Sequence, residues 1–222
     1  SFLFEFRWHL ISQNENIDFL WVCNKLSSHF MNTEVSKTAL RVLFLKKRRD
    51  LSDKDHEEKS FAIANQCLQL PIWDLEYFHL FLPIQSKAEI DTTLILTLLQ
   101  GRDKQVILPK VSGTELEHIL LTDSTVIRKN DWDIPEPDQG LVIQPKQLDV
   151  VFIPLLGYDK VGNRIGYGKG FYDSFLAACK PEVIKVGLSF FLPVEQIQGM
   201  RLEDMKLDYC VHPEGIIDFS DL

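Results

Sequence analysis

Apolar residues recur at helical spacing in two neighbouring segments of the chain. Residues 37 to 50 carry apolar side chains three and four positions apart, and Ser36 can cap the helix that this spacing predicts. A second helix is predicted from Ser52 to about Leu70, because Pro71 cannot continue it. Both helices are expected to bury one face against other elements.

Short apolar runs rich in β-branched and aromatic residues predict buried strands that alternate with helices. They lie at residues 77–82, 106–108, 149–156, 183–189 and 207–211. Between the first two runs, Asp91 can cap a helix that continues through Leu99 and stops at Gly101. Residues 115–121 and 124–127 predict a hairpin added to the sheet. The alternation predicts the α/β class, with a three-layer α/β/α domain and a largely parallel sheet.

Two segments differ from this alternation. Residues 131–145 are rich in Pro, Asp and Gly, which predicts an irregular loop over a site. Residues 1–30 contain seven aromatic residues, about twice the chain-wide 11%, which excludes a typical solvated linker. They also lack the apolar core and cleavage site of a signal peptide. We therefore expect an aromatic-rich N-terminal extension, residues 1–32, before one domain of residues 33–222.

Composition limits the kinds of partner. The 222 residues are 45% hydrophobic and 25% charged, as in an ordinary globular domain. The formal net charge of −8 argues against nucleic-acid binding, although an anionic substrate can bind where a site is locally basic. The candidate cations for such a site are Lys37, Arg41, Arg48, Lys110, Arg164 and Lys169.

Two further observations concern the membrane and the compartment. The longest apolar runs are shorter than the roughly eighteen residues that a membrane span needs, so we expect no membrane partner. The four cysteines are scattered without metal-ligand spacing, which favours a reduced, cytoplasmic protein.

The richest chemistry lies in a glycine-rich loop, residues 162–173, between the strand that ends at Leu156 and a predicted helix at 171–179. Glycines allow close backbone approach to an anion, and the amides and dipole of the following helix favour its negative charge. Arg164 and Lys169 would add full positive charges. The loop has neither the spacing of a Walker A loop nor that of a dinucleotide fingerprint.

Taken whole, the loop Gly-Asn-Arg-Ile-Gly-Tyr-Gly-Lys-Gly-Phe-Tyr-Asp resembles the signature of the 5-formyltetrahydrofolate cyclo-ligase family. Shorter matches occur in the family's order and cover roughly residues 33 to 218. They are Lys37-Thr-Ala-Leu-Arg41, Glu89-Ile-Asp-Thr92, Leu108-Pro-Lys110, Glu136-Pro137 and Leu207-Asp208. One departure is Tyr167, where some family members carry a basic residue.

The resemblance implies a Rossmann-like fold, shared with ribose-phosphate isomerases and CoA transferases, and an enzyme that uses ATP and Mg²⁺. Such an enzyme converts 5-formyltetrahydrofolate to 5,10-methenyltetrahydrofolate, ADP and phosphate. The γ-phosphoryl group is transferred to the formyl oxygen, and N10 of the folate then attacks the formyl carbon. The substrate could carry a polyglutamate tail, and we expect a monomer or a weak homo-oligomer.

The resemblance also implies roles for individual residues. Catalysis is assigned to Lys169, Arg164 and Arg41. ATP binding is assigned to Lys37, Thr38, Ala39, Leu40, Arg41, Arg164, Ile165, Gly166, Tyr167, Gly168, Lys169, Gly170, Phe171 and Tyr172. Substrate binding is assigned to Glu89, Tyr167, Gly168, Lys169, Gly170 and Phe171, and the metal to Asp173 and Asp208.

Two alternatives stay open. A protein of this fold could bind a folate or a phosphorylated metabolite without cyclo-ligase activity, since fold does not determine function. The aromatic N-terminal segment could instead make the chain a binding or scaffolding protein.

Overall fold

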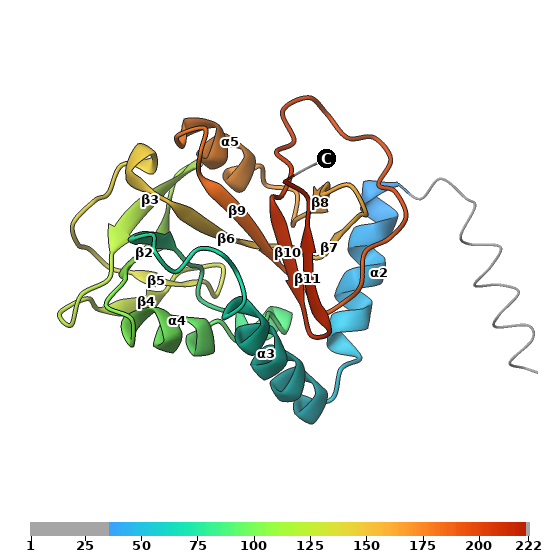
Figure 1. The fold of residues 1–222 in the computed structure, drawn as a ribbon, viewed down its shortest axis with the longest axis horizontal. Coiled ribbons are helices and arrows are strands. Elements are labelled where there is room, and N and C mark those ends of the chain that lie inside the picture. The colour runs from blue at the N-terminus through green and yellow to red at the C-terminus, as the bar shows by residue number, and fades with distance from the viewer. Residues whose placement is uncertain (1–35, 221–222) are drawn as a thin grey trace, which may run out of the picture. The chain divides into compact units, whose positions relative to one another are not determined.

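A seven-stranded sheet runs through the part of the chain that the computed structural model describes, residues 36–220 (Figure 1). The predicted N-terminal extension, residues 1–32, lies outside the described residues. In spatial order the strands are β11, β10, β9, β6, β1, β2 and β3. Their bounds are β1 Tyr77–His79, β2 Gln105–Ser112, β3 Glu115–Leu120, β6 Val150–Pro154, β9 Ile184–Leu188, β10 Tyr209–His212 and β11 Gly215–Asp218.

The inner strands of this sheet are parallel and its two edges are antiparallel. Strands β10, β9, β6, β1 and β2 pair in parallel, whereas β11 and β3 join the edges in the opposite direction. Two small two-stranded sheets stand apart from it: β4 Ile127–Lys129 with β5 Pro135–Pro137, and β7 Gly157–Tyr158 with β8 Arg164–Ile165. The largely parallel sheet predicted from the sequence is confirmed.

The α-helices among the described residues are α2 Lys37–Arg49, α3 Asp53–Cys67, α4 Thr93–Gln100 and α5 Phe171–Ala178, with the short 3₁₀ helices η1 Gln85–Lys87 and η2 Pro145–Gln147. The predicted caps of the first two form, because the Ser36 side chain accepts from the Ala39 N–H and Ser52 accepts from the Asp55 N–H. Within residues 36–220, every helix is too short or too polar to cross a membrane.

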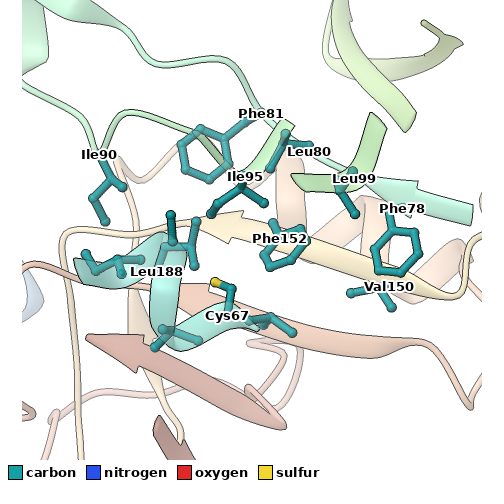
Figure 2. Close-up of a cluster of buried hydrophobic side chains, with 14 of the residues drawn as sticks. Cys67, Phe78, Leu80, Phe81, Ile90, Ile95, Leu99, Val150, Phe152 and Leu188 are labelled. Carbon is teal, nitrogen blue, oxygen red and sulfur yellow. The ribbon is translucent and has the colours of Figure 1, made fainter. Parts of the chain in front are cut away.

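Strand β6 shows how the sheet separates two cores. Val150 and Phe152 point to one face, where α3 and α4 cover them in the cluster of Figure 2. Val151 and Ile153 alternate to the other face, where they join the cluster that contains Phe175 of α5. This period-two alternation in a strand buried on both faces is typical of α/β proteins. The three layers predicted from the sequence are therefore confirmed.

Helix α2 belongs to a third, smaller cluster at the end of the sheet. Its Leu40 and Phe44 pack with Leu156, which precedes β7, and with Ile165 of β8. At Gly157 a β-carbon would lie 2.2 Å from the Phe44 ring, so only glycine permits this approach. The packing fixes α2 beside the loop that follows β8.

The predicted hairpin of residues 115–121 with 124–127 is wrong. Strand β3 pairs instead with β2, through a turn at residues 113–114 in which Gly113 has φ +62°. A glycine with positive φ is the usual signal of such a tight turn. Strand β4 pairs with β5, and β5 lies inside the segment 131–145 that was predicted to be irregular. Strand β11 was not predicted at all.

The strand order defines a topological switch point in the sheet. Strand β1 has β2 on one side and β6 on the other, so the chain winds away from β1 in both directions. In doubly wound sheets, ligands bind in the crevice beyond the carboxyl ends of the strands at this switch point. The site should therefore lie beyond the ends of β1 and β6.

Candidate active site

A cavity of about 440 Å³ lies at the switch point. Phe81 follows β1, Pro109 belongs to β2 and Pro154 ends β6, and all three line it. The remaining wall comes from the N-terminal turns of α2, the segment before α4, the loop between β4 and β5, and the glycine loop. Segments far apart in the sequence therefore meet at the carboxyl edge of the sheet.

The glycine loop turns sharply before α5. Gly168 has φ +88° and Gly170, the residue before the helix, has φ +77°, a region that favours glycine. A β-carbon at Gly168 would also lie 3.3 Å from the guanidinium carbon of Arg41. No described residue accepts a hydrogen bond from the backbone N–H groups of residues 168–170. Free amides beside a helix N-terminus can bind an anion.

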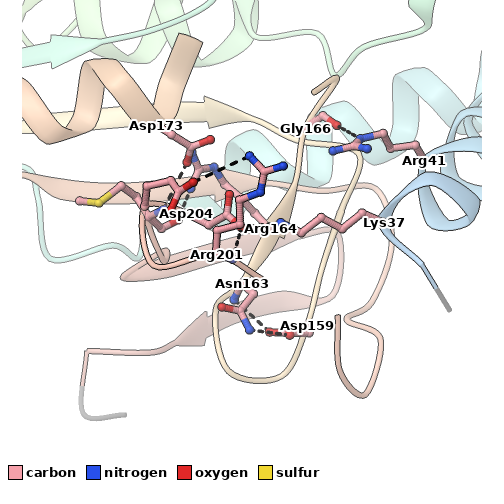
Figure 3. A network of polar contacts seen from close by, with 11 residues as sticks. Lys37, Arg41, Asp159, Asn163, Arg164, Gly166, Asp173, Arg201 and Asp204 are labelled. Atoms are coloured by element: carbon pink, nitrogen blue, oxygen red, sulfur yellow. Dashed lines mark hydrogen bonds and ion pairs between the residues drawn. The ribbon is translucent and has the colours of Figure 1, made fainter. Parts of the chain in front are cut away.

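Four predicted cations, Lys37, Arg41, Arg164 and Lys169, line the cavity. Figure 3 shows Lys37 and Arg41 reaching from α2 toward the loop that carries Arg164. Arg41 donates through Nε to the Gly166 carbonyl at 3.0 Å. The Lys169 ammonium lies 4.6 Å from the centre of the Trp132 ring, a cation–π contact.

Arg48 and Lys110, the other two candidate cations, do not line the cavity. Arg48 is buried at the end of α2 and donates to the Tyr167 hydroxyl and the Leu155 carbonyl. Lys110 donates to the carbonyl of Asp138. Arg48 lies in the last turn of α2, where its side chain points into the interior, so it does not join Lys37 and Arg41 at the cavity.

Among the acids, Asp173 and Asp204 line the cavity. Asp173 Oδ1 accepts from Arg164 at 2.7 Å and from the Met205 N–H at 3.2 Å. Asp204 forms an ion pair with Lys37. Burial alone would raise the pKa of Asp204, but the hydrogen bonds from Lys37 and the Arg201 N–H bring it below its ordinary value.

Asp208, expected to hold a metal with Asp173, lies elsewhere. It precedes β10, at the amino edge of the sheet, and its Oδ2 is 2.8 Å from the Lys185 ammonium. It also accepts from the Lys185 N–H at 2.7 Å and does not line the cavity. In a parallel sheet the amino edge faces away from the switch-point crevice, so the structure does not bring the two carboxylates together. Residues 36–220 contain no group of three or more His, Cys, Asp or Glu side chains suited to a metal.

Glu89 is a buried carboxylate in the cavity wall, only 4% exposed. Its Oε2 accepts from the Ile84 N–H at 2.8 Å, and its Oε1 accepts from the Tyr167 hydroxyl at 2.5 Å. Burial, and then the negative charge of Glu89, raises the pKa of Tyr167, so the hydroxyl keeps its proton and donates.

Four residues assigned to ATP binding by resemblance do not line the cavity. Leu40 and Ile165 belong to the third core cluster, and Thr38 and Ala39 do not line the cavity. The other assigned residues of the loop, Gly166 and residues 167–172, do line it. Residues 38–40 therefore do not line the cavity themselves. They belong to the helical turn that places the Lys37 and Arg41 side chains there.

Five polar or aromatic residues of the cavity have no site role assigned from the sequence: Phe81, Lys87, Trp132, Glu136 and Asp204. Trp132 lies in the Pro- and Asp-rich segment that was predicted to cover a site, and residues 132 and 134–136 of that segment line the cavity. An exposed tryptophan inside a polar loop was the available signal, since such residues often mark binding. Lys87 and Asp204 have no distinguishing local pattern.

Fold and site together define a class, a doubly wound α/β protein with a glycine-rich loop that lines a cavity at the switch point of the sheet. The chain belongs to the 5-formyltetrahydrofolate cyclo-ligase family, whose model matches residues 33–207. The resemblance given by the glycine loop is thereby confirmed.

Individual relatives agree with this family. A probable 5-formyltetrahydrofolate cyclo-ligase of Schizosaccharomyces pombe is 26% identical over 202 residues, which cover 82% of this chain and 98% of the relative. The 5-formyltetrahydrofolate cyclo-ligase of Mus musculus is 28% identical over 200 residues, covering 81% and 95%. The NMR structure of Aquifex aeolicus 5,10-methenyltetrahydrofolate synthetase is 28% identical, with a TM-score of 0.74, and covers 84% of this chain and 94% of its own.

Proposed function

We propose that this enzyme converts 5-formyltetrahydrofolate to 5,10-methenyltetrahydrofolate, using ATP and Mg²⁺ and releasing ADP and phosphate. One observation carries the proposal: four cations and free backbone amides meet a buried carboxylate in one cavity. The cations and amides suit a polyphosphate, and the carboxylate suits the N–H groups of a pterin ring. A cyclo-ligase has to hold both ligands side by side.

The cavity divides between the two ligands. Lys37, Arg41, Arg164 and Lys169, with the amides of residues 168–170, would hold the phosphates. Glu89 would accept hydrogen bonds from the pterin, because its buried carboxylate has no donor groups of its own. Trp132 and Phe171, whose ring centres are 6.4 Å apart, supply flat apolar surface beside it.

The residues at this site support a reaction driven by position and charge. Transfer of the γ-phosphoryl group to the formyl oxygen makes that oxygen a good leaving group, and attack by N10 closes the ring as phosphate departs. The chain's own part is to align the two ligands and to stabilise negative charge on the transferring group. Lys169 and Arg164 would carry the second role, with Arg41 fixed against the loop by Gly166.

Asp173 is the residue that best fits Mg²⁺. Mg²⁺ in nucleotide sites is usually held by one or two carboxylates together with phosphate oxygens. Asp173 lines the cavity, and its Oδ2 accepts no hydrogen bond from the described residues. Asp204 is the second candidate, in place of Asp208. Bound with ATP, the ion would neutralise part of the phosphate charge.

An absorbance assay tests the proposed function directly. The protein is incubated with 5-formyltetrahydrofolate and Mg²⁺, with and without ATP, and methenyltetrahydrofolate is followed by its absorbance. An ATP-dependent rise is expected. No rise from folded protein that binds a nucleotide would contradict the proposal and favour the protein that binds a folate or phosphorylated metabolite without this activity.

A further inference from the structure

Two buried side chains, Arg48 and Glu89, and the half-buried Tyr167 form a chain of hydrogen bonds that ends at the cavity. Arg48 Nη1 donates to the Tyr167 hydroxyl at 2.9 Å, and the same hydroxyl donates to Glu89 Oε1 at 2.5 Å. Arg48 and Glu89 are each 4% exposed. The three residues come from the last turn of α2, the glycine loop and the segment before α4, so the chain joins three elements of the site.

The chain answers an electrostatic problem at Glu89. A buried carboxylate is unfavourable unless hydrogen bonds or a cation compensate its charge. Within the described residues, no Lys or Arg nitrogen lies within ion-pair distance of Glu89. Compensation comes from the Ile84 N–H and from a tyrosine hydroxyl that Arg48 polarises from its other side. The Arg48 guanidinium therefore stabilises the Glu89 carboxylate indirectly, by strengthening the hydrogen bond that the Tyr167 hydroxyl donates.

The direction of each hydrogen bond is fixed. Arginine can only donate, so the Tyr167 oxygen must accept from Arg48. The tyrosine proton is then directed to Glu89, and burial and the carboxylate charge keep that proton on the tyrosine by raising its pKa. The Lys87 ammonium, 4.5 Å from the centre of the Tyr167 ring, restrains the ring on one face. Hydrogen bonds to both of its oxygens thereby hold the Glu89 carboxylate in one orientation.

We propose that Arg48 and Tyr167 are positioning residues for folate recognition, because their hydrogen bonds hold the Glu89 carboxylate in the orientation that meets the bound pterin. This inference rests on the proposed function. It gives a role to the position at which this chain carries Tyr where some family members carry a basic residue. In this chain the basic group is Arg48 of α2, which does not line the cavity and donates a hydrogen bond to the Tyr167 hydroxyl.

The test is a set of steady-state measurements on the full chain. Tyr167→Phe removes only the bridging hydroxyl, Arg48→Lys keeps a positive charge without the guanidinium fork, and Glu89→Gln removes the charge. We expect Tyr167→Phe to raise the KM for 5-formyltetrahydrofolate about 10- to 100-fold, the range for losing a hydrogen bond to a charged group. The KM for ATP should change much less, and Arg48→Lys should give a smaller effect than Arg48→Met.

Coupling to Glu89 distinguishes positioning from a general structural role. If Arg48 and Tyr167 act through the charge of Glu89, adding Tyr167→Phe to Glu89→Gln should cost little further kcat/KM. Tyr158→Phe and Arg49→Lys are matched controls. Tyr158 is buried away from the cavity and Arg49 is exposed on the same helix, so both should leave the KM unchanged.

Three results would overturn the inference: additive effects in the double variant, an unchanged folate KM in Tyr167→Phe, or equal rises in both KM values. If the wild-type protein makes no product, the proposed function fails separately. The same variants are then compared by calorimetric titration with 5-formyltetrahydrofolate. Equal binding by wild type and Tyr167→Phe, or no binding by wild type, would overturn the positioning role as well.

Discussion

Lys169 differs from the other cations of the cavity in its partner, which is the Trp132 ring. A cation–π contact leaves the ammonium hydrogen atoms free to turn toward a phosphate. Lys169→Ala should lower kcat by about 10²- to 10³-fold, the usual effect of removing one group that stabilises transition-state charge. Steady-state kinetics with Lys169→Met as a size-matched companion will measure it. Near-normal turnover would exclude Lys169 from the mechanism.

The same contact predicts an optical signal. If a phosphate draws the Lys169 ammonium away from the Trp132 ring, the environment of that indole changes. Titration with a non-hydrolysable ATP analogue should therefore change the tryptophan fluorescence of the wild type. Trp132→Phe should lose most of the change while Lys169→Ala should reduce it. An unchanged signal in the wild type would contradict the predicted movement.

His79 and His118 lie in the core beside Phe175, with His118 stacked on its ring at 4.1 Å. Burial holds the pKa of His79 well below its ordinary value, and the nearby His118 adds to this effect. Burial lowers the pKa of His118 to about 4. Both imidazoles therefore take up a proton less readily in the folded state than in the unfolded state. The free energy of unfolding is highest above the unfolded pKa of about 6.5, where both imidazoles are neutral in both states, and it decreases as pH falls toward about 4.

We therefore expect the Tm to fall by several degrees between pH 7 and pH 5, since about 1 kcal/mol is worth roughly 2–4 °C in a domain of this size. Calorimetry or circular dichroism across this range will measure the change. His118→Phe should flatten the profile because one of the two groups is removed. A Tm independent of pH would contradict the assignment.

At the scale of elements, the glycine loop depends on its backbone. Gly168→Ala places a side chain where φ is +88° and the Arg41 guanidinium carbon is 3.3 Å away. We expect a loss of about 1–2 kcal/mol of stability from the backbone strain, and a larger loss of activity from the displacement of Arg41. Gly199→Ala is the matched control, because Gly199 has φ +71° with open space around it. Equal activity in both variants would mean that the Arg41 contact is unimportant.

Elements were predictable from sequence where local signals and burial agree. The caps at Ser36 and Ser52 and the apolar run of β6 gave the helices and strands of the parallel core. The β2–β3 hairpin was missed because the signal lay in one glycine, Gly113, inside a run whose alternation was weak. Strand β5 was missed because two of its three residues, Pro135 and Pro137, are prolines, which normally argue against a strand.

Site residues were predictable where they lie in the glycine loop, since its spacing is specific. Arg48 and Asp208 were misplaced because sequence spacing does not say which turn of a helix, or which edge of a sheet, faces the ligand. Asp204 and Lys87 reach the cavity only through tertiary packing. Position in the chain gives no local signal for such contacts.

At the scale of the molecule, the family model matches from residue 33 to residue 207 and leaves residues 1–32 outside the match. Residues 33–222 alone should therefore fold, with a Tm within a few degrees of the full chain and an unchanged kcat/KM. Thermal unfolding and the absorbance assay on both proteins will check this. Aggregation or inactivity of the shorter protein would show that residues 1–32 are needed for the fold.

The internal partners of the cavity cations have a consequence for ligand choice. Lys37 already holds Asp204, Arg164 holds Asp173, and Lys169 holds Trp132. A ligand with one anionic group can replace only one such partner, so it exchanges one contact for another with little gain. A triphosphate presents several groups on one molecule and displaces several partners in a single event. Asp204, Asp173 and Trp132 thus compete with any ligand for the cavity cations, and this competition favours a ligand that carries several negative charges on one molecule.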